Sequence, residues 1–512
     1  MILRQTKPHP GEGDYEQLPT SPTLSSSDTT GGPSMANPDN EEDGFKSTSR
    51  AQGRALDDTE SEMPLEMRPS PSSGTSEPMV VYRVYKRRWF GLIQLVLLNV
   101  IVSWDWLSFS AVSTTSAQYF NVSESAINWL STSFLFSFCV IAPLVIYTLN
   151  RGGPKHAIIA ASVLILLGNW IRFAGTRATG GHFGVVMFGQ ILVGLAQPFV
   201  LSAPTRYSDL WFTPKGRVSA TAIASLANPF GGALGQLIDP VWATKPSDIP
   251  NMVLYIAIIA SIATIPSFFI PSGPPTPPCP SAAESKIPLR QTWRFVLSSV
   301  EFWLIFIPFA VYVALFNAIS TLLNQILAPH GYSETAAGIC GALLIVVGLV
   351  TSAITSPLLD RYPHPLFAIK LQVPLIAASY LAFVWAPDAG DASGSSPSLG
   401  PPYAVAALLG AACFSLVPIV LELLAEVTHP VSPGVTSTLA WGGGQLFGGI
   451  FLVIEDALKD STPPFGMRRA LVFQAVIASL VVPLPLCLGL FGRKVRRRRE
   501  EVDKGVASVQ QE

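Results

Sequence analysis

Two adjacent residues, Asp105 and Trp106, carry the clearest chemistry in this sequence of 512 residues. Asp105 follows Trp89 inside one apolar run, so it lies about 24 Å along a helix that begins there. Ionisable residues at such depth are costly and usually face a polar cavity. A carboxylate there either balances a cationic substrate or carries a proton, and the structural alternative is a hydrogen bond to a neighbouring helix. Trp106 with Phe316 would enclose a cation, at about 2 kcal/mol per desolvated contact, or would simply pack.

Neutral amides accompany these residues on other apolar runs. Gln190 and Gln197 are seven positions apart, and so are Asn317 and Asn324, which puts each pair on one face of a helix. Amides within a membrane bundle either bind a substrate or join helices through hydrogen bonds. Both interpretations stay open from the residues alone.

The elements that must position these side chains are membrane-spanning helices. Hydrophobic residues make up 49% of the chain, charged residues 13%, and the mean hydropathy is +0.40, whereas soluble domains carry about 25% charged residues. A spanning helix needs about 20 apolar residues. The sequence therefore predicts an all-α membrane protein with twelve transmembrane helices, near 89–113, 125–149, 156–175, 183–204, 218–239, 252–271, 299–322, 335–358, 366–386, 403–425, 434–456 and 469–491.

Composition divides the chain into five segments. Residues 1–79 are acidic and rich in Ser and Pro, which predicts a disordered cytosolic tail. Two six-helix halves, 80–271 and 299–492, flank a Pro-rich cytosolic linker at 272–298, and a basic, then polar, tail follows at 493–512.

Lys and Arg in the flanks of the predicted helices fix the orientation. They are much more frequent on the side of the two termini, which places both termini in the cytosol. The one N-x-[ST] sequence, at Asn121, then lies outside, where it is either glycosylated or present by chance.

An internal repeat with an offset of 210 residues relates the two halves. Leu149-Asn150-Arg151 aligns with Leu359-Asp360-Arg361, and Trp106 aligns with Phe316. Two six-helix halves in parallel repeat resemble the layout of the major facilitator superfamily. The two loops resemble its signature after the second helix, G-x-L-x-D-R-x-G-R-K, with Asn150 in place of the Asp. The resemblance implies that Asn150, Arg151, Asp360 and Arg361 take part in gating.

A second group of polar residues is expected at the cytosolic ends of the helices. Glu422 is a candidate partner of Arg206 or Arg361 in a gate that opens and closes. A plain position at the membrane interface is the alternative.

Several longer motifs point to a narrower family. They are Tyr85-Lys86-Arg87-Arg88-Trp89, Ala126-Ile127-Asn128-Trp129-Leu130-Ser131, Ala196-Gln197-Pro198-Phe199, Ile319-Ser320-Thr321-Leu322-Leu323-Asn324-Gln325 and Glu422-Leu423-Leu424-Ala425-Glu426. Together, over residues 80–492, they resemble the FLVCR-type transporters, named after the feline leukaemia virus subgroup C receptor.

That resemblance implies a substrate pocket. Members of the family are linked to choline and ethanolamine, heme and pyridoxine, and in the choline members a Trp, a Tyr and two Gln enclose the quaternary ammonium. Trp106, Gln197 and Gln445 match the Trp and the two Gln. Asn317, beside Phe316, replaces the Tyr, and Asp105 stands where choline members tend to have Gln.

The sequence thus predicts a secondary transporter that moves a small organic cation or amphipathic metabolite, choline-like first, by alternating access. The alternatives are a heme or pyridoxine-type carrier with proton coupling, and a transporter-like nutrient sensor. No Walker-type phosphate loop and no cluster of metal ligands occurs, so we expect no ATP drive, no enzyme activity, no metal and no cofactor. We further expect a monomer in the plasma membrane whose partners are the substrate and the lipid bilayer, without nucleic acid.

Overall fold

The computed structural model describes residues 82–489, apart from 179, 280–281, 283–288, 362–364, 390–397 and 461–465. The predicted tails at 1–79 and 493–512 lie outside the described residues. The elements of the first half, residues 82–271, are α1 (Arg88–Leu107), α2 (Ser113–Phe120), α3 (Glu124–Tyr147), the π-helix η1 (Thr148–Gly152), α4 (Gly153–Arg177), α5 (Phe183–Leu201), α6 (Ala203–Trp211), α7 (Pro214–Trp242), η2 (Pro246–Asp248), α8 (Ile249–Thr264) and η3 (Ile265–Phe269).

The second half, residues 299–489, follows a linker that is partly helical. The linker contains α10 (Leu289–Ser298). The elements of the second half are α11 (Val300–Leu327), η4 (Ala328–His330), α12 (Glu334–Arg361), α13 (Pro365–Phe383), α14 (Gly400–Thr428), α15 (Pro433–Ala457), α16 (Arg468–Leu480) and α17 (Pro483–Leu486).

Ten helical stretches of the described chain are long and apolar enough to cross a membrane. One of them, Glu124–Arg177, has 54 residues and contains both α3 and α4, which η1 joins. α7 has 29 residues but is not among the ten; its sequence is rich in Gly, Ala, Ser and Pro. Helix length and composition therefore do not establish the predicted number of twelve.

Some predicted boundaries differ from the observed helices, and proline accounts for several differences. The run near 183–204 ends its helix at Leu201, and α6 starts two residues later with Pro204 in its first turn. The run near 469–491 ends at Leu480, and Pro483 begins the separate α17. Proline lacks the amide hydrogen and suits the first turn of a new helix.

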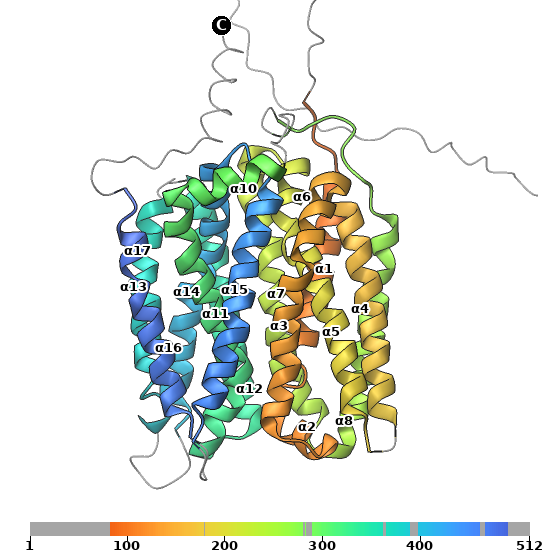
Figure 1. The fold of residues 1–512 in the computed structure, drawn as a ribbon, viewed down its shortest axis with the longest axis vertical. Coiled ribbons are helices and arrows are strands. Elements are labelled where there is room, and N and C mark those ends of the chain that lie inside the picture. The colour runs from red at the N-terminus through yellow and green to blue at the C-terminus, as the bar shows by residue number, and fades with distance from the viewer. Residues whose placement is uncertain are drawn as a thin grey trace, which may run out of the picture. The chain divides into compact units, whose positions relative to one another are not determined.

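The helices of the two halves pack in the same pairs. In the first half the main pairs are α1 with α7, α4 with α5, α3 with α5, and α4 with α8. In the second half they are α11 with α15, α13 with α14, α12 with α14, and α13 with α16. The halves meet through α3 with α15 and through α7 with α12. The helices of the first half lie beside those of the second half in Figure 1.

Glycine makes two of these packings possible. A Cβ on Gly231 of α7 would lie 1.9 Å from the carbonyl oxygen of Val100 on α1. A Cβ on Gly410 of α14 would lie 1.7 Å from the carbonyl oxygen of Leu344 on α12. Any larger residue would push these helices apart, because real Cβ atoms never approach an oxygen so closely.

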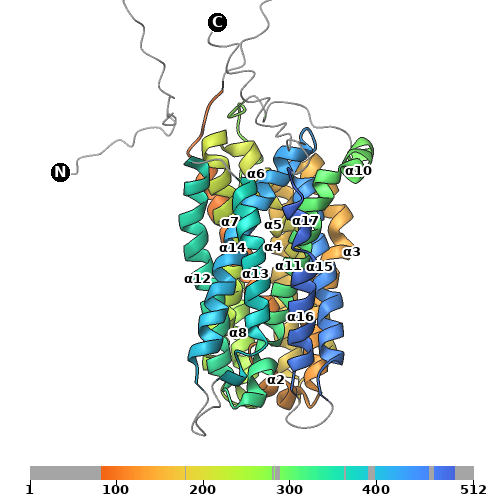
Figure 2. The ribbon, with the colours of Figure 1, turned by 90° about the vertical axis from the view of Figure 1, so that its left-hand side faces the viewer.

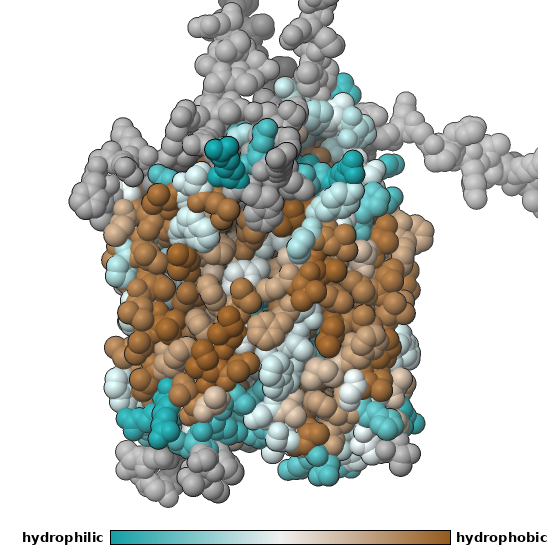
Figure 3. Space-filling model, viewed as in Figure 1, coloured by the Kyte–Doolittle hydropathy of each residue, from teal (hydrophilic) through white to brown (hydrophobic). Residues whose placement is uncertain are grey.

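The two ends of the helix bundle differ in composition from its middle. α6 and α10 lie at one end, which we call the α6 end, and α2 lies at the opposite end, the α2 end (Figure 1 and Figure 2). Hydrophobic residues cover the middle of the face in Figure 3, and hydrophilic residues gather toward the two ends. Large apolar side chains are exposed on the helices, among them Val140 of α3 at 76% and Ile262 of α8 at 66%, as expected for a surface in contact with lipid.

Candidate functional site

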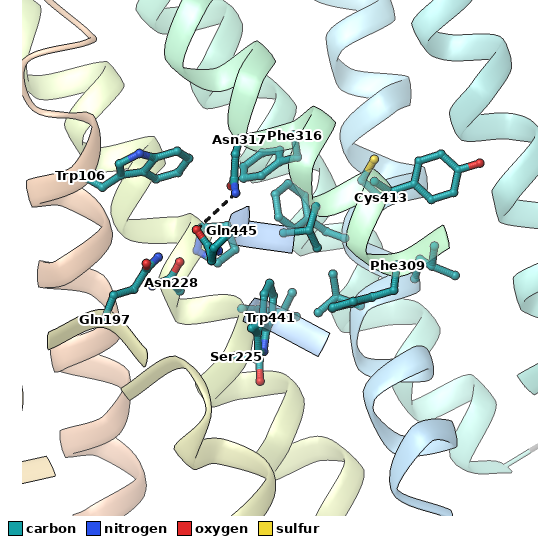
Figure 4. Close-up of a pocket in the computed structure, with 17 residues that line it drawn as sticks. Trp106, Gln197, Ser225, Asn228, Phe309, Phe316, Asn317, Cys413, Trp441 and Gln445 are labelled. Atoms are coloured by element: carbon teal, nitrogen blue, oxygen red, sulfur yellow. Dashed lines mark hydrogen bonds between the residues drawn. The ribbon is translucent and has the colours of Figure 1, made fainter. Parts of the chain in front are cut away.

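A cavity lies between the two halves, near the middle of the helices. Its volume is about 50 Å³ in this conformation, which holds a group of a few heavy atoms and is too small for a porphyrin. Five predicted site residues line it together: Trp106, Gln197, Phe316, Asn317 and Gln445 (Figure 4). They come from α1, α5, α11 and α15, so both halves contribute.

Aromatic rings form much of the cavity wall. Trp106 has one face stacked on Phe134, with ring centroids 6.3 Å apart, and it lines the cavity. Trp441 of α15 also lines the cavity, and its ring meets Phe309 edge to face at 5.3 Å. Phe316 meets Phe414 edge to face at 5.0 Å. The electron-rich faces of such rings attract cations.

Several polar atoms of the wall are buried without a hydrogen-bond partner among the described residues. They are the indole nitrogens of Trp106 and Trp441, the amide oxygen of Gln197 and the hydroxyl of Ser225. Buried polar groups are normally satisfied, so an unsatisfied set around one cavity indicates that a ligand or water completes it. Asn317 donates to the amide oxygen of Gln445 at 3.4 Å, which is a long hydrogen bond that a ligand can replace.

The cavity wall carries no Asp, Glu, Lys or Arg among the residues that line it. An anionic substrate would therefore lose its hydration without meeting an opposite charge. A small cation, in contrast, finds aromatic faces and amide oxygens, which together replace part of its hydration shell.

Asp105, the sixth predicted binding residue, is not part of this wall. Its carboxylate is fully buried and accepts hydrogen bonds from Arg172 on α4 and from Asn169, both at 2.7 Å. The backbone carbonyl of Asp105 accepts from Gln190 of α5 at 3.1 Å. The structure thus places Asp105 in an ion pair inside the first half.

The ion pair has a second carboxylate nearby. One carboxylate oxygen of Asp239, on α7, accepts from the indole nitrogen of Trp104 at 3.0 Å. The guanidinium of Arg172 also lies over the ring of Phe109, 5.0 Å from its centroid. Arg172 is fully buried, and its pair with Asp105 joins α4 to α1.

A network at the α2 end joins the halves and was not predicted. Glu334, at the start of α12, accepts from the backbone nitrogen of Thr114 at 3.1 Å and from the hydroxyl of Thr115 at 2.8 Å, both on α2. Asn324 of α11 donates to the same carboxylate at 3.0 Å. Glu334 therefore clamps the first turn of a helix in the opposite half.

The same network continues along α3. Lys459 pairs with Glu124 at 2.7 Å, and Asn128 donates to Asp456 at 2.8 Å and accepts from Gln325 at 2.7 Å. We call this set, with Glu334, Thr114, Thr115 and Asn324, the α2-end seal. Charged and amide residues at predicted helix ends were its only signal in the sequence, since the partners in the opposite half lie more than 100 positions away.

The residues predicted to gate lie at the α6 end. Arg151 donates to the hydroxyl of Tyr147, four positions earlier, at 2.7 Å, and Asn150 beside it in η1 is half-buried. Arg206 of α6 pairs with Asp209 at 3.0 Å, and Thr205 donates to the carbonyl of Pro433 on α15 at 3.2 Å. The halves therefore also touch at this end.

The remaining predicted gating residues lie on α12 and α14. Arg361 is exposed at the last position of α12, and Glu422 is half-buried on α14. The side chain of Asp360 lies outside the described residues. Asn121, the predicted glycosylation site, is exposed just after α2 and has a left-handed backbone with φ of 51°.

The matches to known proteins agree with this fold and cavity. The profile of the Major Facilitator Superfamily matches residues 95–452. The chain belongs to the major facilitator superfamily. A solved structure of this superfamily, the fucose:proton symporter FucP of E. coli, aligns with a TM-score of 0.57 over 78% of this chain and 97% of its own, at 13% identity.

Two relatives indicate which family within the superfamily this chain resembles. Solute carrier family 49 member A3 of Danio rerio is 32% identical over 406 residues, which cover 77% of this chain and 83% of that protein. The choline/ethanolamine transporter FLVCR2 of Homo sapiens is 24% identical over 86% of this chain and 84% of its own. The predicted resemblance to the FLVCR-type transporters is thus confirmed, and the chain is a multi-pass membrane protein of a transporter superfamily.

Proposed function

We propose that this protein carries a small organic cation, choline-like in size and charge, across a membrane by alternating access. The supporting observation is the cavity between the halves, whose wall combines aromatic rings with unsatisfied amide and indole groups and carries no charged residue. Relatives that are choline/ethanolamine transporters support the same substrate class.

The substrate-binding residues we propose are Trp106, Gln197, Phe316, Asn317 and Gln445, with Trp441 added. Trp106 and Trp441 supply aromatic surface for the cationic group. Gln197 supplies an unsatisfied amide oxygen, which accepts a hydrogen bond from a substrate hydroxyl or amine. Asn317 and Gln445 hold each other until the substrate displaces their long hydrogen bond.

Asp105 has a supporting role in this proposal. Its ion pair with Arg172 already balances its charge, so a cationic substrate gains little from it. The pair lies one residue from Trp106 and fixes the rotation of α1 against α4, which orients the indole ring toward the cavity.

The proposed topology has twelve spanning helices with both termini in the cytosol. α7 is counted as spanning because it packs along α1 and has 29 residues, about 44 Å of helix. Basic residues at the α6 end, among them Arg88, Arg151 and Lys215, favour the cytosolic side. The α2-end seal and the exposed Asn121 then face the exterior, and the plasma membrane is the proposed location.

In this orientation the protein is closed toward the exterior. Opening to that side requires the halves to separate at the α2-end seal, while Arg206, Arg361, Glu422 and the two loop motifs are the proposed gate at the cytosolic side. The transport cycle then alternates between these two closures around one cavity.

Uptake of labelled choline tests the proposal directly. Cells expressing the protein should show saturable uptake above background, and Trp106→Leu should abolish most of it at equal surface expression. Trp170→Leu serves as the matched control, because Trp170 is 43% exposed on the outside of α4. Absence of choline and ethanolamine uptake, with the protein present at the surface, would refute the substrate class.

A further inference from the structure

A buried carboxylate in the second half belongs neither to the cavity wall nor to the α2-end seal. Glu455, near the end of α15, is 0% exposed. One of its oxygens accepts a hydrogen bond from the side-chain nitrogen of Gln474 on α16, at 2.7 Å. Its other oxygen has no hydrogen-bond partner among the described residues.

The groups around Glu455 are neutral oxygen-bearing side chains. The amide oxygen of Gln474, also 0% exposed, has no described partner, and neither does the hydroxyl of Tyr380 on α13, which interacts electrostatically with Glu455. Tyr312 of α11 and Cys413 of α14, which also line the cavity, are the other titratable groups that interact electrostatically with Tyr380. Within the described chain, Glu455 makes no ion pair, unlike Asp105.

An ionised carboxylate without a counter-charge is very costly in such a place. In proteins a group of this kind takes up a proton instead of staying charged. One proton on the unpartnered oxygen neutralises Glu455, and the resulting O–H adds a hydrogen-bond donor to this cluster. A single bound proton thus removes the buried charge.

Glu455 stands on the helix that links the other functional features. α15 carries Trp441 and Gln445 in the cavity and Asp456, the next residue, in the α2-end seal. Gln445 is ten positions from Glu455, about 15 Å along the helix. Separation of the halves at the seal must move this end of α15, and such a movement changes the burial of Glu455.

We propose that Glu455 is a proton-binding site that couples proton movement to the transport cycle. In the closed arrangement described here the carboxyl group holds one proton. When the seal opens and α15 shifts, water reaches the cluster, and the proton leaves to solvent as the carboxylate forms. This inference rests on the proposed transport function, and it assigns the coupling to Glu455 and not to Asp105.

The first test measures substrate movement driven by a pH gradient in proteoliposomes. Labelled choline is placed at equal concentration on both sides, and valinomycin with equal potassium holds the membrane potential at zero. A difference of one pH unit should drive net movement of choline up to about a tenfold ratio for one coupled proton. Glu455→Gln should keep the exchange of labelled choline but lower this ratio to about one.

A matched control shows whether the loss of pH-driven choline movement is specific to Glu455 or follows from the loss of any carboxylate. Asp388→Asn removes a carboxylate that is 46% exposed and paired with His330, and it should leave the pH-driven ratio unchanged. If a pH gradient still drives choline movement in Glu455→Gln, the assignment of the coupling to Glu455 would be overturned. Absence of any choline exchange in the unmodified protein would instead refute the proposed substrate.

A second measurement does not depend on transport. Infrared spectra of the purified protein at neutral pH should contain the C=O band of a buried protonated carboxyl group, and this band should shift on labelling with carbon-13 glutamate. Glu455→Gln should remove it. Spectra showing only ionised glutamate at neutral pH, or a requirement for sodium in place of the proton, would overturn the inference.

Discussion

The aromatic cavity makes a quantitative prediction about charge recognition. Choline and its neutral carbon isostere, 3,3-dimethylbutan-1-ol, have nearly the same shape and the same hydroxyl. Both ligands gain the same apolar contact, but only choline gains cation–π attraction, about 2 kcal/mol for each well-placed and desolvated ring. With Trp106 contributing one such contact, choline should bind about 30-fold more tightly than the isostere.

Trp106→Leu should remove this preference selectively. The leucine keeps part of the apolar contact, so the affinity for the isostere should fall only by the lost contact area. The affinity for choline should fall further, by the additional cation–π energy, and the ratio of the two dissociation constants should move toward one. Titration calorimetry on the purified protein measures both constants, and Trp170→Leu again provides the tryptophan control outside the cavity.

The ratio is the decisive quantity because misfolding or altered packing lowers both affinities together. Equal binding of choline and the isostere to the unmodified protein would refute the cation–π reasoning. An unchanged ratio in Trp106→Leu would refute the assignment to that ring and would leave Trp441, the other tryptophan of the cavity wall, as the ring to replace next.

Three further predictions concern stability and gating. Asp105→Asn leaves the charge of buried Arg172 without its partner and should lower the thermal unfolding temperature, because breaking such a pair costs about 3–5 kcal/mol; a thermal-shift assay checks this. Gly410→Ala should abolish folded expression by fluorescence size-exclusion chromatography, whereas Gly184→Ala, with open space around its Cβ, should not. Glu334→Gln should weaken the α2-end seal and widen distances between spin labels on the two halves there.

The sequence predicted the residues that line the cavity better than it predicted the partners of the buried charged residues. Trp106, Gln197 and Gln445 were expected from family motifs, and the fold brings them together from three helices. Ser225 and Phe309 also line the cavity, but nothing distinguishes them in the sequence from the many Ser and Phe residues of other spans. Their position depends on helix rotation, which hydropathy does not determine.

For the buried charged residues, the sequence revealed one member of the ion pair but not its partner. Asp105 was recognisable because a carboxylate in an apolar run is rare. Its partner Arg172 lies 67 positions away, near a predicted helix end whose position is uncertain by several residues, so the sequence does not reveal the pair. Only the packing of α1 against α4 distinguishes a balanced ion pair from a site that waits for a cation.

In the proposed transport cycle, this distinction between the two carboxylates determines how charge crosses the membrane. The cavity wall has no charged residue, so a bound cation brings its own charge into the protein and meets no fixed counter-charge. Asp105 stays balanced by Arg172 in any conformation that keeps α1 and α4 together. Glu455 is a carboxylate whose charge state can change when α15 moves, because it has a solvating amide but no described cation beside it. If a proton leaves Glu455 when a cation enters, or enters when a cation leaves, the proton offsets part of the charge that the cation carries. The membrane potential contributes about 2.3 kcal/mol per charge per 100 mV. The net charge moved therefore decides whether the membrane potential drives the cycle.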